Sequence, residues 1–195
     1  MALRELIPLG VRSLRDPRGA SRALLGLGLP VQHYWTAFLA VTVLATFLVQ
    51  AVLYLAPPPE TVVLADGTEV PLAPPNALQT LALIGGGLLL LAGLLHLGAK
   101  AFGGTGRFAE MVLAMVWLQA VMIGLNVASI PLLLAGLGGV VEIVLFAALF
   151  WMLGGFTAGI HGFDSAGKAV MAIVGGLFAL ALALSILIVA LGGGA

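Results

Sequence analysis

Five long runs of apolar residues constrain this chain more than any other feature of its sequence. A helix needs about 20 consecutive, mostly apolar residues to cross the hydrocarbon core of a membrane, and each run has that length. The composition agrees, because 62% of the 195 residues are hydrophobic and only 8% are charged, whereas soluble domains are about 25% charged. We therefore predict an all-α, polytopic membrane protein built as a five-transmembrane-helix bundle. The predicted spans are residues 34–56, 77–97, 111–135, 137–160 and 169–191.

Residues 1–33 form an N-terminal segment ahead of the transmembrane domain, which we place at residues 34–191. Apolar residues recur in the segment at helical spacing among five arginines, and Asp16-Pro17 provides the N-cap and first position of a second short helix. This pattern favours one or two amphipathic helices on an anionic membrane surface. A charged cytoplasmic tail that only sets the topology is the alternative.

The distribution of basic residues predicts the orientation. With five spans and a cytoplasmic N-terminus, all eight lysines and arginines lie inside, as the positive-inside rule expects, and the C-terminus lies outside. Arginine exceeds lysine by six to two and Ala, Gly and Leu dominate, which is typical of a GC-rich bacterial genome. We expect a multi-pass protein of a bacterial inner membrane. The outer loop 57–76 is either a short hairpin turning at Asp66-Gly67 or a proline-stiffened linker.

A glycine-rich loop precedes the third span, and an arginine follows it directly. Free N–H groups, the helix dipole and the guanidinium would together suit a phosphate, above all that of a lipid headgroup. A tight turn with a topology-setting arginine is the simpler interpretation. Nucleotide binding is disfavoured, because the loop lacks the lysine-serine pair of a P-loop. The residues of this predicted site are Gly103, Gly104, Thr105, Gly106 and Arg107.

Polar residues within the spans are few. Gln119, Asn126 and Ser129 share one face of the third span, where they form either hydrogen bonds between helices or part of a solute path. Glu142 is the only acidic residue within a predicted span and lies near the outer end of the fourth. A buried carboxylate there would suggest a proton or substrate role, whereas an interfacial one would simply reach water.

Further polar residues fall at the predicted cytoplasmic face, where a metal or acid–base site is conceivable. They are His96, Lys100, His161, Asp164 and Lys168. The sequence has no cysteine, no HExxH motif and no histidine paired with a nucleophile, so we predict no catalytic residue, no metal and no cofactor. Gly155 and Gly159 form a GxxxG pair for close helix packing, within the bundle or in a homo-oligomer.

Three stretches of the chain resemble the Yip domain family of Ypt/Rab-interacting membrane proteins, and its bacterial branch in particular. They are residues 102–108, Pro131, and the run holding Phe150-Trp151, residues 159–162, Ser165 and Lys168-Ala169. The resemblance covers residues 20–191 and implies a five-helix membrane domain with a cytoplasmic N-terminus. Eukaryotic members look like adaptors that engage small GTPases through a long N-terminal region, and we do not carry that role over to residues 1–33.

The expected function is that of a non-enzymatic scaffold or adaptor, because the spans carry packing ladders and few polar groups. Its expected partners are membrane lipid, another membrane protein or a second copy of the chain, and no nucleic acid. The alternative is a small transporter or channel that uses Glu142 and the polar stripe of the third span.

Overall fold

The structure, a computed structural model, describes residues 3–59, 61–63, 67–71, 73–165, 167–171, 173–176 and 178. Four of the five predicted spans are long helices in it, and the largest difference in bounds is at the end of α4, which reaches residue 101 rather than 97. In chain order the elements are α1 (Leu3–Arg15), α2 (Pro17–Leu25), α3 (Val31–Leu55), β1 (Thr61–Val63), β2 (Glu69–Pro71), α4 (Ala77–Ala101), α5 (Phe108–Leu134) and α6 (Gly138–His161).

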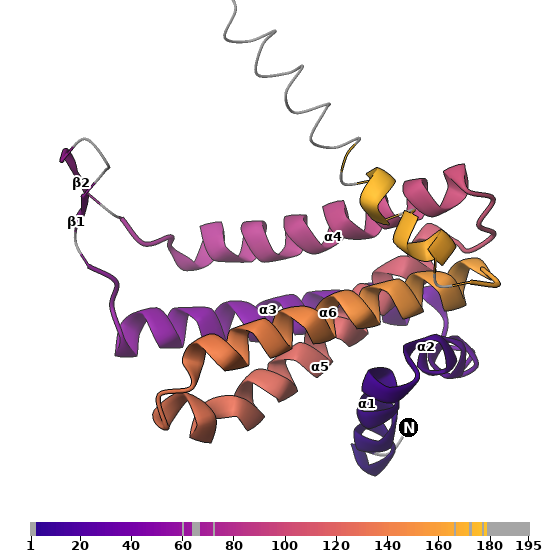
Figure 1. The fold of residues 1–195 in the computed structure, drawn as a ribbon, viewed down its shortest axis with the longest axis horizontal. Helices are drawn as coiled ribbons and strands as arrows, with labels where there is room; N and C mark the ends of the chain where they lie inside the picture. Colours follow the sequence, from indigo (N-terminus) through magenta and orange to yellow (C-terminus); the bar gives the residue numbers. More distant parts are fainter. Residues whose placement is uncertain are drawn as a thin grey trace, which may run out of the picture.

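Helices α3, α4, α5 and α6 are each long enough to cross a membrane. They contain 24 to 27 residues, and at about 1.5 Å per residue the shortest is about 36 Å long, against a hydrocarbon core of about 30 Å. Figure 1 shows them running along one common direction. Helix α3 packs against α4 and α5, and α5 packs against α6. The described part of the chain is thus a multi-pass helical membrane protein.

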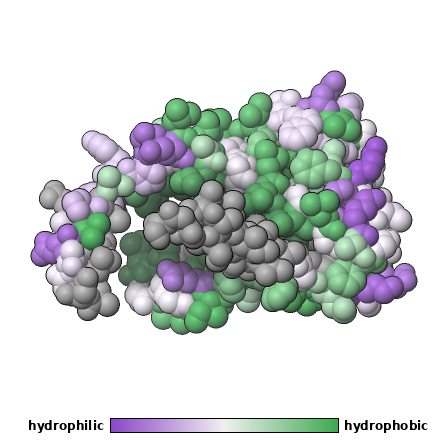
Figure 2. Space-filling model, turned by 90° about the horizontal axis from the view of Figure 1, so that it is seen from above, coloured by the Kyte–Doolittle hydropathy of each residue, from purple (hydrophilic) through white to green (hydrophobic). Residues whose placement is uncertain are grey.

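The outer faces of these helices are apolar. Leu39, Phe47, Leu83, Ile143 and Phe146 are exposed large hydrophobic side chains on three different helices. Figure 2 shows hydrophobic residues over the middle of the molecule and hydrophilic residues gathered toward its ends. A helix that is hydrophobic all round requires apolar surroundings on every side, so lipid covers what the neighbouring helices leave open.

The core lies in one half of the bundle, around the first half of α5. Met111, Met115, Met152 and Phe156 are fully buried there, between α5 and α6. Residues of the second half of α5, such as Leu134, are mostly exposed. The tightly packed half is therefore the one that holds the beginning of α5 and the end of α6.

The loop between α3 and α4 contains the hairpin, so of the two predicted alternatives the hairpin is the one in the structure. Strands β1 and β2 pair antiparallel, with Val62 opposite Val70. The proposed turn residue Asp66 lies outside the described residues, and Gly67 beyond it has φ +82°.

The predicted fifth span, residues 169–191, falls largely outside the described residues. Residues 167–171 and 173–176 are helical. Among the described residues four helices have the length and hydropathy of a membrane span, so the predicted count of five is tested only for the first four.

The N-terminal segment contains two helices, as its pattern predicts. The helical segment is interrupted at Asp16, whose side chain accepts a hydrogen bond from the N–H of Gly19 at 2.8 Å. Pro17 follows at the first position of α2. Helix α2 packs along the second half of α6, and α1 reaches the same helix farther from its C-terminal end.

Candidate functional site at the basic end of the bundle

The end of α4, the start of α5 and the end of α6 meet at one end of the bundle, together with α1 and α2 (Figure 1). Lys100, Arg107 and His161 mark the three helix ends. We call this region the basic end. Its polar residues are held in place by the contacts of α2 with α6, of α1 with α5 and α6, and of the glycine loop with α6.

Helix α2 contacts α6 through two glycines spaced one turn apart. A Cβ atom at Gly155 would lie 2.3 Å from Cγ of Pro17, and one at Gly159 would lie 1.8 Å from Oγ of Ser21 and 2.8 Å from the carbonyl oxygen of Arg18. Of the two predicted uses of the GxxxG pair, within the bundle or in a homo-oligomer, the structure shows a contact within the chain. The partner of the pair is the amphipathic helix α2 rather than another span.

Arg18 binds the segment that follows α6. Its guanidinium donates to the carbonyl of Phe163, and to the carbonyl of Asp164 at 3.2 Å. Both carbonyls lie just beyond the C-terminal end of α6, which carries the negative end of the helix dipole, so a cation here is favourable. Gly162, with φ +70°, ends α6 in the left-handed conformation and turns the chain toward Arg18.

Two tryptophans from the long helices hold α1. Trp117 of α5 donates to Oγ of Ser13 at 2.8 Å, and Ser13 donates in turn to the carbonyl of Leu9 at 2.9 Å. Trp151 of α6 donates to the carbonyl of Leu14 at 2.9 Å. Helix α1 is thus attached to the side of the bundle by directional bonds as well as by apolar contact.

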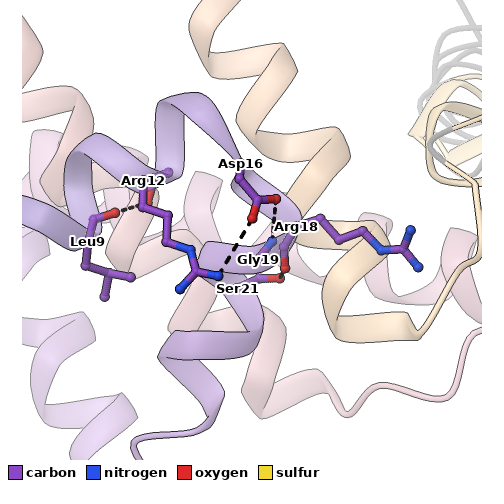
Figure 3. Close-up of polar contacts among 7 residues, drawn as sticks. Leu9, Arg12, Asp16, Arg18, Gly19 and Ser21 are labelled. Atoms are coloured by element: carbon purple, nitrogen blue, oxygen red, sulfur yellow. Dashed lines mark hydrogen bonds and ion pairs between the residues drawn. The ribbon is translucent and has the colours of Figure 1, made fainter.

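Two neighbouring hollows lie beside Arg18 and Asp16. The first, about 690 Å³ in volume, lies between the α1–α2 junction, α6 and the three residues Val170, Ile173 and Val174; we call it the apolar groove. The second, about 450 Å³, lies along α1 and α2 and is lined by Arg12, Asp16, Arg18, Gly19, Arg22 and Ala23. Figure 3 shows Arg12 turned toward Asp16 and Arg18 pointing away from them, toward the end of α6.

The predicted glycine loop packs closely on the end of α6. A Cβ atom at Gly104 would lie 2.6 Å from Nδ1 of His161, and one at Gly106 would lie 2.6 Å from Cγ2 of Ile160. Thr105 donates its N–H to the carbonyl of His161 at 3.2 Å. Gly104 and Gly106 are therefore required because the loop backbone comes close to the backbones of α4 and α6. This agrees with the interpretation of the loop as a tight turn.

Most donors that an anion would need in this loop already have partners. Gly103 and Gly104 donate to carbonyls of the last turn of α4. Arg107 donates from its backbone N–H and from Nε to the carboxylate of Glu110, each at 2.8 Å. The hydrogen bond with Glu110 raises the pKa of Arg107 above its usual value. Binding of a lipid phosphate at residues 103–107 stays a prediction, and it would compete with these bonds.

Replacing Gly106 by alanine is expected to lower the free energy of unfolding by about 1–3 kcal/mol, because the new methyl group would overlap α6. Gly87→Ala in α4 is the matched control, since nothing lies within 4 Å of its Cβ position. Chemical unfolding in detergent micelles, followed by circular dichroism, measures both. Equal midpoints for the two variants would contradict the close packing of the loop.

The structure brings together two of the five polar residues predicted at this face. The rings of His96 and His161 lie 5.4 Å apart between centroids, and His161 is only 2% exposed. Neither ring nitrogen of His161 has a hydrogen-bond partner among the described residues. Lys100, Asp164 and Lys168 are exposed instead. Within the described residues no group of three potential metal ligands occurs.

The polar residues predicted for a solute path are spread out. Asn126 and Ser129 bond to carbonyls of their own helix, at 2.8 Å and 2.7 Å, and Gln119 lies half-buried two turns closer to the core. Glu142 is exposed on α6, near the opposite end from the histidines. Among the described residues these hydrogen bonds stay within α5 and link no second helix.

Sequence reasoning missed how the N-terminal helices bind α6. It identified the GxxxG pair and the start of α2 separately. The signal that would have joined them is the spacing of Pro17 and Ser21, which repeats the four-residue spacing of Gly155 and Gly159. The hydrogen bonds from the two tryptophans to α1 carry no comparable signal.

These features define a multi-pass helical membrane protein with an N-terminal helix pair docked on α6. The family model of the Yip1 domain matches residues 11–193, which is nearly the whole chain, and the protein belongs to this family. The match includes α2 and every long helix. No curated protein and no solved structure matches the chain.

Proposed function

We propose that this protein is a non-enzymatic membrane scaffold or adaptor that binds its partner through α1 and α2. The observation that supports this most is the close contact of α2 with Gly155 and Gly159. An amphipathic helix held in this way presents a fixed surface rather than a loose tail. Arg12 and Arg22 are exposed on that surface.

The proposal places residues 1–33 in the cytoplasm as the binding segment and residues 34–191 in a bacterial inner membrane as a five-helix domain, with the C-terminus outside. The arrangement of basic residues at one end supports this orientation, since cytoplasmic ends carry the excess of lysine and arginine. The partner would be another membrane protein, a second copy or anionic lipid. No cofactor or catalytic step is part of the proposal, and the transporter alternative gains no support from the positions of Asn126 and Glu142.

The test is co-purification of the tagged protein in native lipid particles, followed by mass spectrometry. The double variant Arg12→Gln with Arg22→Gln should bind a reproducible partner more weakly. For an anionic partner surface, we expect the affinity to fall about fivefold for each arginine removed. Lys100→Gln with Lys168→Gln is the matched control, because it removes the same charge from exposed residues at the same end. No enriched partner, or equal loss in both pairs, would reject the adaptor role of α1 and α2.

A further inference from the structure

The apolar groove is lined by residues that suit a hydrocarbon chain. Phe150 and Trp151 of α6, with Val170, Ile173 and Val174 beyond it, supply the large apolar side chains of its lining. Its volume of about 690 Å³ falls within the range of about 300–1,000 Å³ typical of small-molecule sites. Gly154 also lines the groove, and no atom outside its own helix backbone lies within 4 Å of the position where its Cβ would be.

The side of the groove that the α1–α2 junction forms carries positive charge. Arg15, Asp16 and Arg18 line it at the α1–α2 junction. Asp16 is compensated, because its carboxylate lies 3.7 Å from the guanidinium of Arg12 and accepts from a backbone N–H. Arg18 is bound only to carbonyl oxygens, which leave its charge in place. Arg15 is exposed, and no described carboxylate pairs with it.

This combination of an apolar groove and a positively charged side matches one kind of ligand. We propose that the groove binds an anionic phospholipid, with one acyl chain between α6 and the side chains of Val170, Ile173 and Val174, and with the phosphate at Arg15. Basic pockets beside transmembrane helices bind anionic headgroups by the same physics. The inference rests on the proposed function in that α1 and α2 must stay docked at the membrane, and it names a lipid that they help to hold.

Trp151 provides a built-in reporter, because it lines the groove. The purified protein is placed in vesicles of dioleoyl phosphatidylcholine with a minor fraction of phosphatidylglycerol brominated on its acyl chains, since bromine quenches tryptophan on contact. The same fraction of brominated phosphatidylcholine is the lipid control. The Trp151 signal is the part of the fluorescence that is lost in Trp151→Phe.

We expect brominated phosphatidylglycerol to associate with Trp151 about fivefold more strongly than brominated phosphatidylcholine, and Arg15→Gln to remove that preference. Gly154→Leu should also remove it by filling the groove. Gly124→Leu is the matched control and should keep the preference, because its Cβ position is equally open but lies on α5, outside the groove.

Equal quenching by the two lipids would overturn the proposal, as would a preference that survives Gly154→Leu. Absence of quenching by either lipid would mean that the chain itself or a second copy fills the groove, and would overturn it as well. Arg15→Gln changes an exposed side chain, so it remains informative if Gly154→Leu fails to fold. The vesicles contain no other protein, so failure of the adaptor proposal leaves this outcome unchanged.

Discussion

Replacing both Gly155 and Gly159 by alanine should detach α2 from α6. The new methyl groups would meet Pro17 and the backbone of Arg18 at less than contact distance, and the two helices would have to separate. Overpacking of this kind typically costs about 1–3 kcal/mol at a single site, so we expect the double variant to lose about 3 kcal/mol of unfolding free energy or more. Gly154→Ala is the control, because its Cβ position is open and alanine favours a helix.

Detachment can be measured directly, since the chain has no cysteine of its own. Ala20 is fully buried on α2, so a cysteine introduced there by Ala20→Cys should react with a maleimide only when α2 leaves α6. The rate should rise in the double glycine variant and stay low with Gly154→Ala. A low rate in both would show that the bundle accommodates the methyl groups and that the glycine contact is not what holds α2.

Removing the guanidinium by Arg18→Ala should be the second large effect. The carbonyls of Phe163 and Asp164 would lose a charged donor. Hydrogen bonds to charged groups contribute about 1.5–3 kcal/mol, and we expect a loss of that size. Arg22→Ala, one turn later on the same helix and exposed, should change the unfolding free energy by less than about 0.5 kcal/mol.

Unfolding in detergent micelles measures the stability of the two arginine variants. Hydrogen exchange then shows which part of the chain is destabilised. The N–H of Phe163 bonds to the carbonyl of Ala158 and should exchange faster in Arg18→Ala. Arg18→Lys should recover only part of the loss, because an ammonium group lacks the planar fork that spans two carbonyls. Equal stability of the alanine variants at positions 18 and 22 would show that Arg18 does not tie α2 to the segment after α6.

The long helices could be predicted because hydropathy is a local signal. A run such as residues 77–97 has the length and hydropathy of a membrane span whatever its neighbours are, and the structure has α4 there, ending at residue 101. The division of the N-terminal segment at Asp16 was equally readable, since N-cap and proline chemistry acts within one turn. The fifth span has the same kind of signal, but most of it lies outside the described residues.

The site was less predictable, because it depends on pairs of residues far apart in the sequence. His96 and His161 were each expected at the same face, yet nothing in their local sequence places one ring beside the other. The glycine loop shows the same limit. Its composition fits a tight turn, the simpler interpretation, and also an anion site. Only the contacts with Ile160 and His161 show how closely the turn packs, and anion binding there stays a prediction.

The contact between Arg18 and the segment after α6 can form only late in the synthesis of the chain. The two partners, Arg18 and Asp164, are separated by 146 residues. Chains are made at about 5–20 residues per second, so roughly 7 to 30 seconds pass between the appearance of the arginine and that of its acceptors. During this interval α2 has no α6 to bind, and an amphipathic helix in that position rests on the membrane surface. Helices α3, α4, α5 and α6 are thus synthesised before α1 and α2 can dock on α6.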